Sequence, residues 1–113
     1  MELVLTVRFY KSNAGKEPAR AWLLSLDADD RKVIGHDIKT VQFGWPLGMP
    51  LVRKIEPGLW EVRSTLKGGI ARVFFTTTGA TMVLLHGFVK KSDKTPDDEL
   101  KTARKRKNEV NYG

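Results

Sequence analysis

The segment from Leu59 to Lys91 constrains the fold most, because it combines β-branched, aromatic and aliphatic residues with evenly spaced turns. Two glycine-containing turns, Lys67-Gly68-Gly69 and Thr78-Gly79, divide it into three short stretches. Successive side chains of a strand point to opposite faces of the sheet, so each stretch can be sorted by parity. We therefore predict three antiparallel strands joined by hairpins.

Parity divides the side chains of these strands into two sets. The first is almost wholly apolar and is predicted to face a core: Trp60, Val62, Ser64, Ala71, Val73, Phe75, Val83, Leu85, Gly87 and Val89. The second mixes cations with aromatic rings and is predicted to form the working surface: Glu61, Arg63, Thr65, Arg72, Phe74, Thr76, Leu84, His86, Phe88 and Lys90.

The N-terminal part predicts one strand and two helices. The strand is expected over Leu3–Tyr10, which is rich in β-branched and aromatic residues. A first helix begins near Pro18, since proline suits the first helical position. A second helix is capped by Asp27 or Asp29 and ends at Gly44.

Another strand is expected over residues 51–56, and a last helix starts at Thr95-Pro96-Asp97-Asp98, which supplies a capping hydroxyl, a proline and acids. The predicted fold class is α+β in a single domain, residues 1–113. It has an N-terminal strand, two helices, a four-stranded antiparallel meander and a C-terminal helix. The helix pair is expected to cover one face of the sheet and to leave the other open.

The charge of the chain points to a polyanionic partner. The 113 residues carry a formal net charge of +7, and residues 90–107 hold eight basic and four acidic residues. Nucleic acid is the favoured partner, ahead of an anionic membrane or an acidic protein. A solubilising basic surface is the alternative. The absence of cysteine excludes disulfides and thiolate metal sites. The chain has no apolar run near the ~20 residues of a membrane span and no signal-like start, and cytoplasm is the default location.

The candidate chemistry is cationic and needs no metal, since neither a phosphate-binding glycine loop nor a metal-spaced cluster is present. Arg63 and Arg72 are expected to converge on one phosphate, and His86 to transfer protons near neutral pH. Phe74 and Phe88 could stack unpaired bases. The alternatives are a histidine hydrogen-bonded within the sheet and rings packed against the C-terminal helix. Parity is expected to place five cationic or titratable residues on the open face: Lys54, Arg63, Arg72, His86 and Lys90.

Such a surface suits RNA cleavage in which the ribose 2′-hydroxyl attacks the adjacent phosphorus. The protein then needs only to orient the chain, stabilise negative charge and move protons. A nuclease of this kind requires the guanidinium groups to converge on the uncovered face.

Several motifs resemble the RelE/ParE toxin superfamily, and most closely its HigB-like, phage-derived branch. They are KIEPGLWEVR (54–63), the glycine-then-RVFF stretch (69–75), LLHGFVKKSDKTP (84–96) and Glu99, Ala103 and Arg106 in the last helix. The resemblance implies a type II toxin of a toxin–antitoxin system, an endoribonuclease (mRNA interferase) that cuts mRNA, in many relatives only on the ribosome. It implies no cofactor, no membrane and a cognate antitoxin of helix-turn-helix type.

Carried over to this chain, the resemblance implies catalytic roles for Arg63, Arg72, His86 and Lys90. The RNA-binding residues are expected to be Lys54, Phe74, Phe88, Lys91 and Lys94, and no metal ligand is expected. Two other functions remain open. One is a ParE-like inhibitor of DNA gyrase that cuts nothing, and the other is a non-catalytic nucleic-acid-binding regulatory protein.

Overall fold

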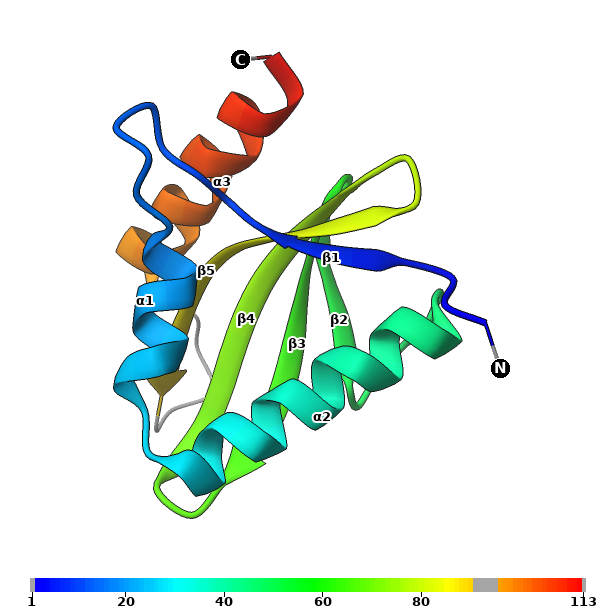
Figure 1. The fold of residues 1–113 in the computed structure, drawn as a ribbon, viewed down its shortest axis with the longest axis vertical. Helices are drawn as coiled ribbons and strands as arrows, with labels where there is room; N and C mark the ends of the chain where they lie inside the picture. Colours follow the sequence, from blue (N-terminus) through cyan, green and yellow to red (C-terminus); the bar gives the residue numbers. More distant parts are fainter. Residues whose placement is uncertain (1, 91–95, 113) are drawn as a thin grey trace.

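Three helices and one five-stranded sheet make up the described part of the chain in the computed structural model, which is residues 2–90 and 96–112 (Figure 1). In chain order the elements are β1 (Thr6–Phe9), α1 (Pro18–Ser25), α2 (Ala28–Gly44), β2 (Val52–Glu56), β3 (Leu59–Leu66), β4 (Gly69–Thr78), β5 (Thr81–Lys90) and α3 (Asp97–Tyr112). The predicted α+β class and the predicted order of elements are confirmed.

The sheet has the strand order β1-β5-β4-β3-β2. Strands β2 to β5 form the predicted antiparallel meander, and β1 adds to β5 in parallel. Strand β1 is shorter than the predicted Leu3–Tyr10. Its start is lost because the backbone N–H groups of Val4 and Leu5 donate to the carbonyl of Gln42 in α2, so the sheet ladder begins only at Thr6.

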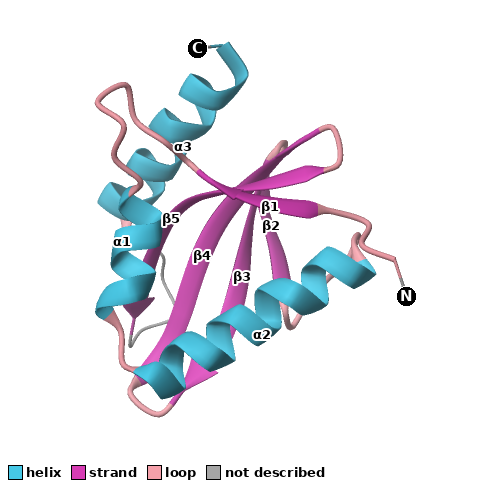
Figure 2. Ribbon diagram, in the orientation of Figure 1, coloured by secondary structure: helices cyan, strands magenta, loops and turns pink. Residues whose placement is uncertain are grey.

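Helices α1 and α2 lie on the same side of the sheet (Figure 2). Pro18 occupies the start of α1, and the Asp27 carboxylate caps α2 by accepting the backbone N–H of Asp30 at 2.9 Å. Both predicted starts are confirmed, with Asp27 rather than Asp29 as the cap. The core on this side joins the helices to every strand and includes Leu5, Ala19, Ile34, Ile38, Val41, Val52, Val62, Ala71, Val73, Phe75, Met82 and Leu84.

A β-bulge changes the parity of β5. Phe74 pairs with His86 and Phe75 pairs with Leu84, so Leu85 is an extra residue that has no counterpart on β4. Before the bulge, Leu84 joins the core under α1 and α2, whereas Val83 and Leu85 join a second core on the other face. The parity prediction was therefore wrong for these three residues, because it continued a strict alternation through the bulge.

The second core places α3 against β4 and β5, on the face that α1 and α2 leave free. It contains Tyr10, Leu59, Phe74, Val83, Leu85 and Ala103, with Ile55, Phe88, Leu100 and Val110 packed around them. The helix pair covers one face as predicted, but the opposite face is not open where α3 crosses it. The capping role predicted for Thr95 falls outside the described residues.

Candidate functional site

The register of β2 and β3 moves Lys54 away from the expected cationic face. Lys54 pairs with Trp60, whose ring belongs to the core under α1 and α2. Arg53 instead pairs with Glu61, and its Nη1 atom lies 3.9 Å from the Glu61 carboxylate. The predicted placement of Lys54 beside the other cations was wrong. Arg53 takes that position because paired residues share a face.

Arg72 is buried in an ion pair. Its Nη1 atom donates to Glu61 Oε1 at 2.8 Å, and the two side chains are 1% and 0% exposed. Arg63 pairs with Arg72 in the register, but its Nη1 atom lies 3.7 Å from Met49 Sδ. Arg63 also lines an edge pocket with residues of α2. The two guanidinium groups therefore do not converge on an open face, and the expected grip on a phosphate was wrong.

The aromatic rings of this face stack on each other. Phe74 is fully buried, and its ring centroid lies 5.8 Å from that of Phe88 and 6.4 Å from that of His86. Both phenyl rings belong to the core that includes Ala103 of α3. Packing against the C-terminal helix is therefore the observed arrangement, and Phe74 has no free face for a base.

The lysines near the end of β5 are only partly described. Lys90 is 6% exposed and pairs with Ile70 at the end of the β4–β5 ladder, on the same face as His86 and Arg72. Lys91 and Lys94 lie outside the described residues.

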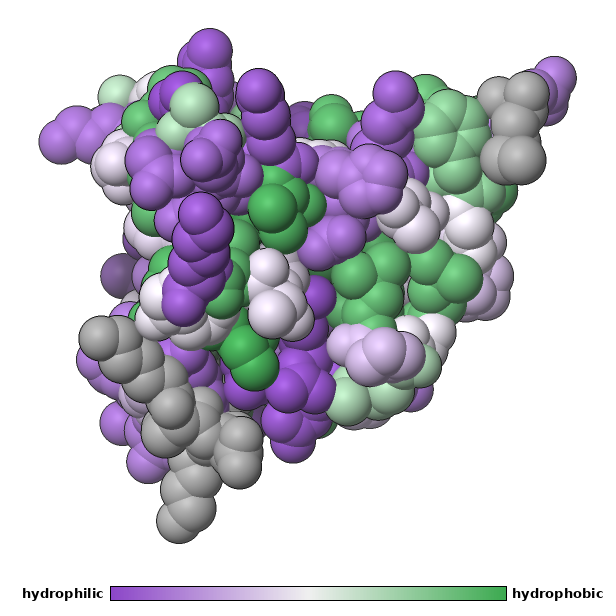
Figure 3. All heavy atoms as spheres, turned by 90° about the horizontal axis from the view of Figure 1, so that it is seen from below, coloured by the Kyte–Doolittle hydropathy of each residue, from purple (hydrophilic) through white to green (hydrophobic). Residues whose placement is uncertain are grey.

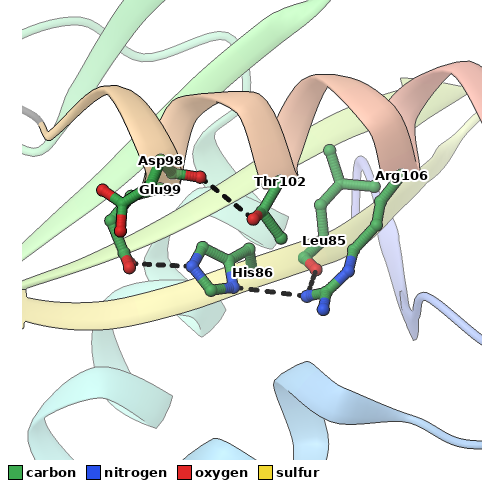
Figure 4. Close-up of polar contacts among 6 residues, drawn as sticks. All are labelled: Leu85, His86, Asp98, Glu99, Thr102 and Arg106. Carbon is green, nitrogen blue, oxygen red and sulfur yellow. Dashed lines mark hydrogen bonds and ion pairs between the residues drawn. The ribbon is translucent and has the colours of Figure 1, made fainter.

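His86 lies between two charged side chains of α3 (Figure 4). Its Nε2 atom is 2.8 Å from Glu99 Oε2, and its Nδ1 atom is 3.2 Å from Arg106 Nη1. A guanidinium can only donate, so Nδ1 accepts and the ring hydrogen lies on Nε2, which donates to Glu99. With 19% of its side chain exposed, His86 remains within reach of solvent.

Glu99 and Arg106 received no individual role in the sequence predictions, although the motif that contains them was recognised. Their spacing to Ala103 follows the i, i+4, i+7 pattern of one helix face, and Ala103 is fully buried against the sheet. This spacing is the signal that could have assigned both residues to the face that meets His86.

Further polar links hold α3 along the sheet. Arg104 Nε donates to Glu56 Oε1 at 2.6 Å, and Lys107 Nζ donates to the carbonyl of Pro57 at 3.0 Å. The Tyr10 hydroxyl donates to Glu109 Oε2. This hydrogen bond and burial of the ring raise the pKa of Tyr10, and the negative charge of Glu109 adds to the effect.

A pocket of about 410 Å³ opens between the β1–α1 loop and α3. It is lined by Tyr10, Ser12, Lys16, Pro18, Thr102, Lys105, Arg106 and Glu109. Arg106 is one of the lining residues, and its guanidinium carbon lies 5.4 Å from the centre of the ring of Tyr10, another lining residue. Arg106 thus connects this pocket with His86.

One face of the molecule mixes hydrophilic and hydrophobic side chains. Seen from below, hydrophilic side chains dominate the left and centre of the molecule, and hydrophobic ones gather towards the right (Figure 3).

Within residues 2–90 and 96–112, no cluster of three or more histidine or carboxylate side chains could hold a metal ion. None of the described helices has both the length and the apolar character required to cross a bilayer.

The fold and the site define a small basic α+β protein in which a histidine is held between a carboxylate and a guanidinium at the edge of a helix–sheet interface. A model of the family described as phage derived protein Gp49-like matches residues 21–108, a range that begins within α1, ends within α3 and contains the whole histidine cluster. The chain belongs to this family, a toxin-like family of toxin–antitoxin systems. No curated protein matches the chain.

Proposed function

We propose that the chain is the toxin of a type II toxin–antitoxin system and that it cuts mRNA without a metal ion. Membership of a toxin-like family supports the first part. The observation that carries the second is the hydrogen-bonded row Glu99–His86–Arg106, which combines a base, its orienting carboxylate and a cation. Arg63 and Arg72 have no catalytic role in the proposed reaction.

In the proposed reaction, His86 Nδ1 takes the proton of a ribose 2′-hydroxyl. The 2′-oxygen forms a bond to the adjacent phosphorus, the bond from phosphorus to the 5′-oxygen breaks, and that oxygen takes a proton from water. Glu99 stabilises the imidazolium through Nε2–H and keeps the ring oriented. The guanidinium of Arg106 balances the negative charge that develops on the phosphate oxygens.

Among the predicted RNA contacts, Phe88, Lys91 and Lys94 remain in the proposal, because they belong to the segment that continues from His86. Lys90, predicted to be catalytic, lies in the same segment and remains with them. Buried Arg72 and Phe74 are better suited to holding the sheet, and Lys54 lies on the other face. An antitoxin partner follows from the family. We propose that it is a helix-turn-helix protein, that mRNA on the ribosome is the substrate and that the toxin acts in the cytoplasm.

The test compares the two histidines of the chain. His86→Ala removes the proposed base, whereas His36→Ala removes an exposed histidine from the outer side of α2. After a brief pulse of expression, new 5′ ends of cellular transcripts are mapped and growth is followed. We expect wild type and His36→Ala to arrest growth and cut transcripts. His86→Ala should slow cleavage by about 10²–10⁴-fold, the usual contribution of a positioned base.

Circular dichroism and urea unfolding of the purified variants show whether His86→Ala remains folded. Wild-type cleavage by a folded His86→Ala would overturn the proposal. Intact transcripts together with accumulating DNA breaks would favour the gyrase inhibitor. A gyrase inhibitor needs no cationic cluster on the sheet, so the separation of Arg63 from Arg72 is compatible with this alternative.

A further inference from the structure

We propose that the pocket between the β1–α1 loop and α3 binds a phosphate group of the RNA, and that this phosphate draws Arg106 away from His86 Nδ1. The inference rests on the proposed function, since it concerns the base of that reaction. It adds a binding site and a gate: the base becomes available only when a phosphate is present.

The pocket is suited to an anion because three of its lining side chains are cationic. Lys16 comes from the loop, and Lys105 and Arg106 come from α3. The one lining carboxylate, that of Glu109, accepts the hydrogen bond of the Tyr10 hydroxyl. Cations brought together in a cavity repel one another unless an anion is bound between them.

The loop is shaped to hold Lys16 at the pocket. The backbone N–H of Ser12 donates to the carbonyl of Lys16 at 2.8 Å, and the N–H of Lys16 donates to Ser12 Oγ at 3.1 Å. Gly15 has a φ of 81°, a left-handed conformation that favours glycine and closes the loop. Lys16 is therefore presented opposite α3 by hydrogen-bonded backbone.

Arg106 links the pocket to His86 through its Nη1 atom alone. This atom donates to Leu85 O at 2.9 Å and to His86 Nδ1 at 3.2 Å. A guanidinium has five N–H donors, so three are not used in these two bonds. A phosphate in the pocket can engage those donors, and bidentate bonds to an anion are stronger than a bond to a neutral ring nitrogen.

While Arg106 donates to Nδ1, the lone pair of the base is occupied. The charged groups that face the ring are Glu99 on Nε2 and Arg106 on Nδ1, both from α3, and Phe74 and Phe88 stack beside it. Moving Arg106 onto a phosphate frees Nδ1 and leaves the contact with Glu99 in place. Substrate binding would thus make the Nδ1 lone pair of His86 available to accept a proton.

The binding step is tested by NMR on protein that carries ¹⁵N in its histidine rings. Inorganic phosphate and a 2′-deoxy dinucleotide, which cannot be cleaved, are the two probes. We expect both to shift the His86 Nδ1 resonance and to leave those of His36 unchanged. Arg106→Lys retains the charge but loses the fork, and its His86 resonance should respond to neither probe.

The pocket itself is tested with charge variants. We expect Lys105→Ala and Lys16→Ala each to lower the slope of log affinity for RNA against log salt by about 1, as for one lost phosphate contact. Lys32→Ala, which removes an exposed lysine from α2, should leave the slope unchanged.

Two results would overturn the gate. One is a His86 resonance that does not respond to either probe in the wild-type protein, and the other is an unchanged response in the Lys16→Ala, Lys105→Ala double variant. Either result, together with an inactive and folded His86→Ala, would remove the gate and leave the nuclease proposal intact. A folded His86→Ala that still cuts RNA would remove the nuclease proposal itself.

Discussion

Arg72 on β4 and Glu61 on β3 form an ion pair of 2.8 Å between side chains that are almost completely buried. A second arginine, Arg53, approaches the same Glu61 oxygen from the surface, at 3.9 Å. Within the described part of the chain, Glu61 Oε2 and Arg72 Nε have no hydrogen-bond partner. Arg72 is therefore a structural residue in this geometry, and its replacement is expected to lower the stability of the fold.

We predict that Arg72→Ala destabilises the protein by about 3–5 kcal/mol, because it leaves the Glu61 carboxylate buried without its partner. Urea unfolding measures the loss. Glu61→Leu combined with Arg72→Met removes both charges and retains volume, so it should restore stability to near the wild-type level. A folded Arg72→Ala of wild-type stability would contradict the prediction. If Arg72→Ala is destabilised as predicted, loss of its toxicity reports unfolding rather than chemistry.

A second prediction concerns the contact between β5 and α1. A Cβ atom added at Gly87 would lie 2.3 Å from the Trp22 ring. Gly87→Ala should therefore destabilise the protein by about 1–3 kcal/mol, the usual effect of overpacking. Gly35→Ala is the matched control. It replaces a glycine inside α2 at a position where an added Cβ atom meets nothing within 4 Å. It should stabilise the protein by about 0.5–1 kcal/mol. Thermal unfolding of both variants decides the point.

A third prediction follows from the raised pKa of Tyr10. Because the fold favours the neutral phenol, its stabilisation is complete below the ordinary value of 10.0 and is lost as the pH rises through the raised pKa. Unfolding free energies measured from pH 8 to pH 11 should fall more steeply for wild type than for Tyr10→Phe. At neutral pH, Tyr10→Phe should lose about 0.5–1.5 kcal/mol for the hydrogen bond.

Glu109→Gln provides the control for this effect. It removes the charge that opposes ionisation of the phenol and weakens the hydrogen bond, so the slope of its stability against pH should lie between those of wild type and Tyr10→Phe. Identical slopes in all three proteins would show that Tyr10 does not titrate differently in the folded state.

The attachment of α3 gives a fourth prediction. Ala103 is fully buried against the sheet, whereas half of the Arg104 side chain is exposed although it is paired with Glu56. Ala103→Leu should destabilise the protein by about 1–3 kcal/mol through overpacking. Arg104→Ala should change stability by less than about 1 kcal/mol, because exposed ion pairs contribute little. Chemical unfolding compares the two, and a larger loss for Arg104→Ala would reverse this ranking.

Much of the fold follows from local signals in the sequence. Pro18, Asp27 and the glycine turns marked the helix starts and hairpins, because they act on backbone dihedrals and caps within a few residues. The parallel pairing of β1 with β5 carries no such signal, since it depends on how the helix pair packs.

The candidate site was predictable only in part, because it depends on the strand register and on a helix that is distant in sequence. His86 was identified from its residue type. Its partners Glu99 and Arg106 lie 13 and 20 positions further along the chain and were not assigned. The neutralisation of Arg72 could have been inferred, since Glu61 was placed on the same face, but the burial of both side chains depends on the packing of the opposite face of the sheet.

The extra residue in β5 lets one strand serve two hydrophobic layers. Its first half supplies Met82 and Leu84 to the layer beneath α1 and α2, while its second half turns His86 towards α3. Deletion of Leu85 would restore regular pleating with Leu84 still opposite Phe75 and His86 still opposite Phe74, so the imidazole would keep facing α3, whereas the second core would lose the Leu85 side chain. The extra residue thus places two neighbouring side chains, Leu85 and His86, on the same face of the sheet, so that the strand contributes to the second core directly beside the imidazole.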